Sequence, residues 1–283
     1  MKPAAFAYER PSTVAATLDL LAQRNDDTKI LAGGQSLVPM MNLRLARPAR
    51  LIDINRVAGL DYIRREGDVI AIGALARHAD VKASALVAQA CPLMHMAYEW
   101  VAHGAVRNRG TLCGNLCHAD PASEMPAVAL AVGATMVLRS KKGERRVAAA
   151  DFFQGLYTTA LCADEMLLEV RVPIAPAGQK AGFREVSMRK GDFAWALAAV
   201  LLSVSGGKIT QVAIAVAGVG DRACRLPTVE AALAGQPASH TTFARAGALA
   251  SAAVNPFGDA AVSAEYRKDL IRTLVERALA DAA

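Results

Sequence analysis

The feature that most constrains this chain is a pair of glycines between an apolar stretch and a segment with the apolar spacing of a short helix. Residues 28–32 are typical of a buried strand, and Gly33, Gly34, Gln35 and Ser36 follow them. Glycine allows unusual backbone angles and a close approach of another group. Consecutive N–H groups at a helix start form a cradle for an anion such as phosphate. A plain turn with a serine cap fits the same residues, so both interpretations stay open.

A second loop repeats this chemistry. The stretch TLCGN, from Thr111 to Asn115, places a hydroxyl, a glycine and an amide between two apolar helical segments. We therefore expect one diphosphate to be held between two loops from different subdomains. Downstream, Asp120 and Glu124 are placed to accept hydrogen bonds from a ribose, although Glu124 is equally suited to capping the helix that begins near Met125.

Composition limits the classes of protein that remain. The chain has 283 residues, of which 53% are hydrophobic, enough for two domains, and its 5% aromatic content argues against a stacking surface for nucleic acid. The basic cluster at residues 141–146, within a net charge of +6, indicates a solvated hairpin tip. Five cysteines, no signal-peptide pattern and no apolar membrane span predict a cytoplasmic protein with reduced thiols.

The order of elements predicts an α+β protein in two parts. Residues 1–55 alternate strands and helices, and residues 56–176 contain hairpins, helices and the second loop. The stretch PIAPAGQ is the best linker in the chain. Beyond it, residues 177–283 predict a three-stranded antiparallel sheet followed by helices, which is a second α+β domain.

Two other motifs carry no site. Residues 218–223 contain a formal dinucleotide fingerprint, but neither the required helix nor an acidic residue about twenty positions on follows it. Cys113-x3-Cys117-His118 lacks the four ligands and spacing of zinc or iron–sulfur sites. The remaining histidines are scattered, so we expect neither a metal site nor a catalytic acid–base pair in this chain.

The motifs together resemble a known family. AGGQSL, then T-x-C-G-N-L with its DPASEMPA continuation, and finally RKGDFA are similar to the flavin-carrying medium subunit of the molybdenum hydroxylases. This family includes aerobic carbon monoxide dehydrogenase, nicotine and caffeine dehydrogenases, and the flavin domain of xanthine dehydrogenase. The resemblance covers essentially the whole chain.

The resemblance implies a fold and a set of FAD contacts. It implies an FAD-binding domain of the vanillyl-alcohol-oxidase (PCMH) type over residues 1–176, with subdomains of about 1–55 and 56–176, and a smaller domain over 177–283 that closes over the isoalloxazine. It implies a diphosphate loop of Ile30, Leu31, Ala32, Gly33, Gly34, Gln35, Ser36 and Leu37, and a second cradle of Thr111, Gly114 and Asn115. It also implies Val101 on the flavin, Asp120 and Glu124 on the adenosine part, a backbone contact at Leu167 or Leu168, Arg184 or Lys190 as a cation near the flavin, and Phe193 shielding the ring.

Two details qualify these contacts. The family often has two glycines in the second loop, and this chain has Cys113 at the first of those positions. Because that position does not require an unusual backbone angle, we expect binding to survive. No histidine stands in the AGGQSL loop, which predicts a non-covalent flavin.

The function implied is that of an electron relay. FAD on this chain would take electrons from two [2Fe–2S] clusters on a small partner subunit and pass them to an external acceptor. The molybdenum–molybdopterin cofactor would reside on a large subunit, in a heterotrimer or its dimer. A free-standing FAD oxidase or reductase and a non-redox nucleotide-binding assembly subunit are the alternatives. Neither the organic substrate nor the acceptor can be inferred from this chain.

Overall fold

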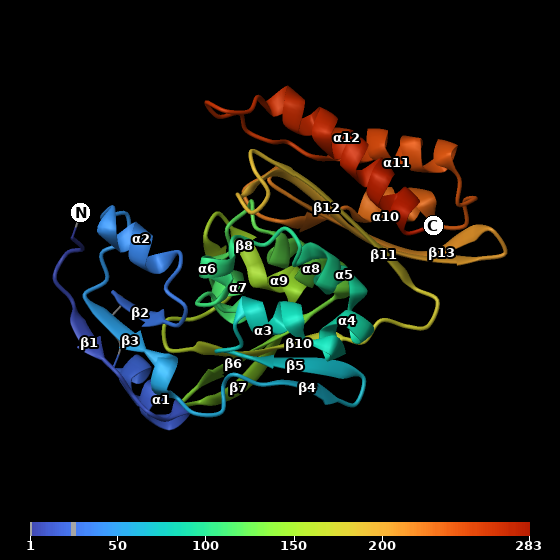
Figure 1. The fold of residues 1–283 in the computed structure, drawn as a ribbon. Coiled ribbons are helices and arrows are strands. Elements are labelled where there is room, and N and C mark those ends of the chain that lie inside the picture. The colour runs from blue at the N-terminus through green and yellow to red at the C-terminus, as the bar shows by residue number, and fades with distance from the viewer. Residues whose placement is uncertain (1, 24–26) are drawn as a thin grey trace.

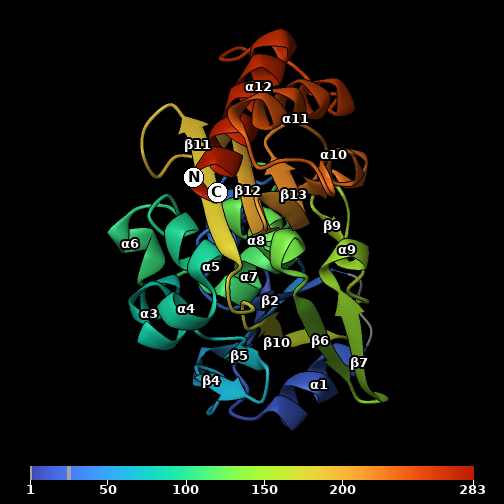
Figure 2. The same ribbon diagram turned by 90° about the vertical axis from the view of Figure 1, so that its right-hand side faces the viewer.

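The computed structural model describes residues 2–23 and 27–283, and it has an α+β fold built in layers. A sheet of five strands forms the first layer. Figure 1 shows short helices above it, then a second sheet, and outermost the helices α11 (His240–Ala253) and α12 (Ala264–Asp281). A small N-terminal unit lies beside these layers. The view in Figure 2 shows the same succession of layers from the side. The expected α+β class is confirmed.

The N-terminal unit is a three-stranded parallel sheet with strand order β1–β3–β2. Leu18 and Leu21 of its first helix pack on Ile52 of the central strand. The first loop leaves this sheet at the end of β2 and leads into α2. The elements are β1 (Ala7–Glu9), α1 (Val14–Ala22), β2 (Thr28–Leu31), α2 (Leu37–Asn42), β3 (Arg50–Asp53) and the 3-10 turn η1 (Ile54–Arg56).

The second unit contains a five-stranded antiparallel sheet with strand order β4–β5–β10–β6–β7. Its central strand is a mostly apolar run in which Val170 and Val172 are buried. The strands are β4 (Ile63–Glu66), β5 (Val69–Gly73), β6 (Thr135–Ser140), β7 (Gly143–Ala148) and β10 (Met166–Pro173), with a separate small ribbon of β8 (Phe153–Gly155) and β9 (Thr158–Thr159).

Short helices cover the face of this sheet that is turned toward the C-terminal sheet (Figure 1). One of them, α8, is buried on every side from Met125 to Ala131, because it lies between two sheets. It ends at Gly133, which has the left-handed angle common after helices. The helices are α3 (His78–Ala83), α4 (Ala85–Ala90), α5 (Pro92–Ala97), α6 (Gly104–Arg107), α7 (Leu112–His118), α8 (Glu124–Val132) and α9 (Ala149–Phe152).

The C-terminal sheet has four strands, so the prediction of three was wrong. The sheet contains β11 (Lys180–Ser187), β12 (Ala194–Ser205), β13 (Lys208–Ala217) and β14 (Cys224–Arg225), and α10 (Pro227–Leu233) follows. The added strand has only two residues, too few for an alternating pattern to show in the sequence. Arg225 is held by a bidentate ion pair with Glu230, at 2.6 and 2.7 Å.

The long strand β12 buries both of its faces, and the two faces belong to different cores. Leu197, Ala199 and Leu201 belong to a core that also contains α5 and α8, whereas Ala196, Ala198, Val200 and Leu202 pack with α11 and α12. Successive side chains of a strand point to opposite faces, which produces this alternation. The first of these two cores, which includes Leu197, Ala199 and Leu201, therefore extends without a break from the second unit into the C-terminal domain. Among the described residues, no helix is both long and apolar enough to cross a membrane.

Candidate cofactor-binding site

The two loops singled out in the sequence lie in direct contact. A Cβ atom placed on Gly33 would stand 2.6 Å from the Cα atom of Gly110 and even closer to the carbonyl oxygen of Arg109. Real Cβ atoms do not approach other atoms so closely, so glycine is required for this approach. The first loop of the N-terminal unit thus meets the second loop at the start of α7.

A polar network holds the two loops together. Asn55 donates its side-chain N–H to the carbonyl oxygen of Ala32 at 2.7 Å and to Asp53 Oδ1 at 2.6 Å. Arg77 donates to Asn55 Oδ1 at 2.7 Å and, through its other terminal nitrogen, to the carbonyl oxygen of Arg109. We call Asn55 and Arg77 the brace. Sequence reasoning missed both residues; the available signal was a polar side chain shortly after each of two buried strands.

The first loop presents hydrogen-bond donors that no residue in the described part of the chain uses. The backbone N–H groups of Gly34, Gln35 and Ser36 have no acceptor there, and the Ser36 hydroxyl forms no cap bond although Ser36 precedes α2. Gly34 has a φ of 71°, which favours glycine. Ser36 thus occupies the N-cap position of α2 without making the side-chain bond of a cap. A row of free donors of this kind is what an anion cradle requires.

Several donors of the second loop already have acceptors, within the loop or in neighbouring segments. Thr111 Oγ1 accepts the N–H of Gly114 at 3.1 Å and caps α7. The Asn115 side chain exchanges hydrogen bonds with the hydroxyl of Ser123, at 2.8 and 3.2 Å. Cys113 is buried within the helix and has no positive φ, as expected from the sequence. Hydrogen bonds therefore close the start of α7, and the first loop rests against the residues just before it.

A buried histidine at the start of α3 packs against the residue that precedes the second loop. The backbone N–H of His78 donates to the carbonyl oxygen of Gly110 at 3.0 Å, and its ring lies against the Gly110 Cα. Its Nδ1 atom is 3.1 Å from the hydroxyl of Tyr98, which is fully buried. Burial, with a smaller contribution from the charge of Arg107, lowers the pKa of His78 to about 4. The ring is therefore neutral near pH 7.

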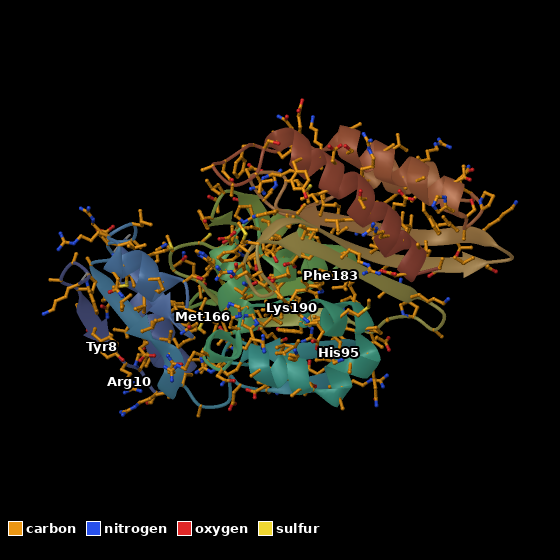
Figure 3. The ribbon with its side chains drawn as sticks, turned by 45° about the horizontal axis from the view of Figure 1, so that its top comes forward. Tyr8, Arg10, His95, Met166, Phe183 and Lys190 are labelled. Carbon is orange, nitrogen blue, oxygen red and sulfur yellow. The ribbon has the colours of Figure 1, made fainter. Side chains whose placement is uncertain are left out.

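The turn between β11 and β12 carries the other predicted contacts. Lys190 Nζ lies 5.6 Å from the centre of the Trp100 ring and 3.9 Å from Glu99 Oε2. Figure 3 shows Lys190 between the helical layer and the C-terminal sheet. The neighbouring Val101 is buried, whereas Phe193 is mostly exposed. The C-terminal domain thus places Lys190 and Phe193 at its junction with the second unit.

Comparisons with known proteins identify the family. A family model described as the FAD binding domain in molybdopterin dehydrogenase matches residues 4–175, and the CO dehydrogenase flavoprotein C-terminal domain matches residues 181–282. The chain belongs to the FAD-binding medium subunits of the molybdenum hydroxylases. The resemblance seen in the motifs is confirmed.

Three relatives illustrate the closeness of this match. The chain is 42% identical to the 6-hydroxypseudooxynicotine dehydrogenase complex subunit alpha of Paenarthrobacter nicotinovorans and 40% identical to the caffeine dehydrogenase subunit beta of a Pseudomonas species, in each case over 100% of this chain and 96% of the relative. The carbon monoxide dehydrogenase structure from Hydrogenophaga pseudoflava superposes with a TM-score of 0.97 at 39% identity, covering 100% of this chain and 98% of that one.

For a medium subunit of this family, the first loop fits the FAD diphosphate. Three adjacent N–H groups and a hydroxyl have no acceptor among the residues that the structure describes, and phosphate oxygens are strong acceptors. Gln35 donates its amide back to the Gly33 carbonyl at 3.1 Å, which steadies the turn. The flanking residues serve as scaffold: Ile30 and Leu31 pair with β3, and Leu37 begins α2.

Asp120 and Glu124 are each already engaged by the protein. Asp120 accepts the N–H of Ala122 at 2.9 Å and the hydroxyl of Tyr157 at 3.2 Å. Glu124 is the first residue of α8 rather than its cap, and burial raises its pKa. Glu185 of β11 is buried with no hydrogen-bond partner for either oxygen in the described part of the chain. Burial, followed by the charge of Glu124, raises the pKa of Glu185.

The remaining predicted contacts differ in where they face. Arg184 is exposed and paired with Asp281 of α12, at 2.6 and 2.8 Å, on the sheet face that is turned away from α5 and α8. It does not accompany Lys190, which leaves Lys190 as the candidate cation. Leu167 and Leu168 lie at an irregularity of β10, and the Leu168 carbonyl already accepts the N–H of Ala74 at 2.9 Å.

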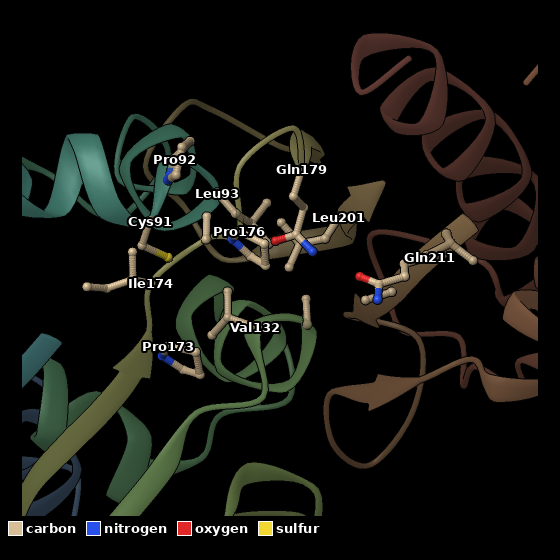
Figure 4. A pocket seen from close by; sticks show the side chains of 14 residues that line it. Cys91, Pro92, Leu93, Val132, Pro173, Ile174, Pro176, Gln179, Leu201 and Gln211 are labelled. Carbon is tan, nitrogen blue, oxygen red and sulfur yellow. The ribbon is translucent and has the colours of Figure 1, made fainter. Parts of the chain in front are cut away.

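A separate cavity lies away from the two loops. It has a volume of about 380 Å³ and lies at the seam between the second unit and the C-terminal domain, beside Cys91, Pro176 and Gln211 (Figure 4). None of the predicted FAD contacts lines it. A second hollow of about 300 Å³ is lined in part by Asn55 and Arg77, so it borders the brace. Loop contacts and unused donors, rather than cavity size, locate the site.

Proposed function

We propose that this chain is the FAD-carrying electron-transfer subunit of a molybdenum-containing hydroxylase or dehydrogenase complex. In this role it takes electrons from the [2Fe–2S] clusters of a partner subunit and passes them to an external acceptor. The proposal rests chiefly on one observation, the row of unused N–H groups from Gly34 to Ser36 at the contact with the second loop.

The residues of this chain would bind and orient the cofactor. FAD, when bound, supplies the reversible storage of two electrons. The first loop would hold the diphosphate through backbone N–H groups and Ser36, while the brace keeps Gly33 against Arg109. The ammonium group of Lys190 would favour the reduced, anionic form through its positive charge. Phe193 would limit access of water to the ring. No side chain needs to act as a general acid or base.

The proposed partners are a large molybdenum subunit and a small iron–sulfur subunit, in a heterotrimer or its dimer. The names of the relatives support this, because they are subunits of dehydrogenase complexes or medium chains. A cytoplasmic location belongs to the same proposal, since all five cysteines are free thiols.

A two-part experiment tests the proposal. The chain expressed alone should be yellow, and acid precipitation should release the chromophore into the supernatant, because the first loop contains no histidine for a covalent link. Absence of flavin absorbance would favour a non-redox assembly subunit. Expressed with both partners, the chain should co-purify with them, and only the complex should reduce a dye with an organic substrate. Turnover of a small molecule by the chain alone would favour a free-standing oxidase.

A further inference from the structure

The segment from Val101 to His103 is held in a conformation that its sequence does not favour. Ala102 has a φ of 47°, in the left-handed region that residues with a Cβ atom rarely adopt. Such a residue persists only where surrounding contacts impose the conformation. Arg107 supplies these contacts, since its Nη1 atom donates to the carbonyl oxygens of Val101 at 2.9 Å and Ala102 at 2.6 Å.

The turn between β11 and β12 rests on this same segment. A Cβ atom on Gly191 would lie 2.9 Å from the carbonyl oxygen of Ala102 and 2.7 Å from Nδ1 of His103. Gly191 also has a φ of 96°, so two independent constraints require glycine there. The Ala102 carbonyl therefore lies between the Arg107 guanidinium on one side and the backbone of Gly191 on the other.

Lys190 belongs to the turn that rests on this segment. The turn is closed by a hydrogen bond from the N–H of Asp192 to the carbonyl of Arg189 at 2.9 Å, so it moves as a unit. Within the part of the chain that the structure describes, the side chain of Lys190 contacts only Trp100 and Glu99, and these contacts are exposed. Weak exposed pairs do not fix a long side chain by themselves. At Gly191 the backbone of the turn lies directly against the 101–103 segment, and His103 also lies 3.8 Å from Asp192. The start of β12 is held separately, by the hydrogen bond from the Ala194 N–H to the carbonyl oxygen of Ala122 at 3.1 Å.

We propose that Arg107 is a positioning residue that fixes the Val101–His103 segment as the seat for the Gly191 turn and thereby sets the location of Lys190. Arg107 would not touch the cofactor itself. It would act through two carbonyl oxygens: that of Val101, itself a predicted flavin contact, and that of Ala102, which lies against Gly191. The consequence for the flavin rests on the proposed function, whereas the consequence for the turn does not.

Hydrogen–deuterium exchange on the full chain without added FAD tests the structural step. Arg107→Ala and Gly191→Ala should each raise exchange in peptides covering residues 188–193 by at least tenfold. Arg107→Lys, which keeps a donor but not the fixed guanidinium fork, should give an intermediate rate. Arg245→Ala is the matched control, because Arg245 is exposed and bonds to no residue that the structure describes.

Unchanged exchange in Arg107→Ala would overturn the proposal. Should that variant not fold, Arg107→Lys and Gly191→Ala carry the same comparison: raised exchange in both supports the proposal, and unchanged exchange in Arg107→Lys overturns it.

A second measurement tests the effect on the flavin. The reduction potential of bound FAD should become more negative in Arg107→Ala and in Gly191→Ala, because both displace a positive charge. The double variant should shift it no further than either single variant, since both changes act on one contact. Additive shifts would show independent actions and overturn the proposal. A wild-type chain that binds no FAD would refute the proposed function instead, and the exchange result would still decide the role of Arg107.

Discussion

The two loops that meet at Gly33 and Gly110 have similar residue types but opposite hydrogen-bonding states. The first loop leaves three consecutive N–H groups and the Ser36 hydroxyl without an acceptor among the described residues. The second loop closes on itself through Thr111 and is supported by His78. A hydroxyl and a glycine therefore do not define a phosphate site by themselves. From this difference we propose that the first loop binds the diphosphate, and that the second loop mainly supports it.

Substitution at the loop contact should have the largest effect. Gly33→Val would place side-chain atoms against the Arg109 carbonyl and separate the loops. We expect a loss of FAD affinity of at least a hundredfold and a fall of about 1–3 kcal/mol in the free energy of unfolding. Flavin titration and urea unfolding of the cofactor-free chain measure the two effects.

Gly34→Ala serves as the comparison for that variant. A Cβ atom on Gly34 meets only the side-chain ends of Leu31 and Val38, at 3.0 and 3.2 Å, and its cost comes from the φ of 71°. It should therefore leave the loops in contact. Equal stability of the cofactor-free Gly33→Val and wild-type chains would mean that the contact between the loops contributes nothing.

Acid should act on the second loop through His78. The pKa of His78 is lowered from its ordinary value of 6.5 to about 4, so the unfolded chain binds a proton that the folded chain excludes. Stability is then lost as the pH falls from about 6.5 toward 4, by roughly 3 kcal/mol over the whole interval. The free energies of unfolding of the wild-type and His78→Gln chains, measured as a function of pH, should converge or cross in this window.

The exposed His240 provides the control for acid sensitivity. His240→Gln should keep the pH profile of the wild-type chain. Parallel wild-type and His78→Gln curves between pH 6.5 and 4 would show that His78 does not carry the acid sensitivity.

The smallest effects are expected from two substitutions, one in each loop, that should affect FAD affinity and stability in opposite proportions. Ser36→Ala removes a donor to the phosphate and should weaken FAD binding by about ten- to a hundredfold, with the midpoint of the cofactor-free chain unchanged. Thr111→Val removes a helix cap and should cost about 1 kcal/mol of stability, with a smaller change in affinity. Calorimetry with and without FAD separates the two. The reverse pattern would assign the roles of binding and rigidity to the opposite loops.

The chemistry of the site was predictable where it is written in consecutive residues. The motifs around Gly33 and Gly114 predicted the two loops, because the chemistry of a loop depends on the residue types within it. The brace was not predictable, because Asn55 contacts Ala32 from 23 positions away and Arg77 contacts Arg109 from 32 positions away. No periodic pattern marks such a pair.

The orientation of Arg184 shows a second limit. Neighbouring residues of a strand point to opposite faces of the sheet, so a shift of one residue exchanges the two faces. Glu185 points into the core shared with α5 and α8, and Arg184 points toward α12. The residue types alone favour the reverse, since a buried carboxylate is costly. Only the register of β11 on β12 settles the matter.

The two-faced strand β12 has a consequence for how the chain folds and how it can be divided. Because Leu197 and Leu201 complete the core around α8, a fragment ending near residue 176 would expose apolar surface that the intact chain covers. We therefore expect the second unit and the C-terminal domain to melt in one cooperative transition. The linker therefore separates two segments of the sequence but not two independently stable units. A truncated or recombined version of this protein would have to keep the residues on both sides of the linker.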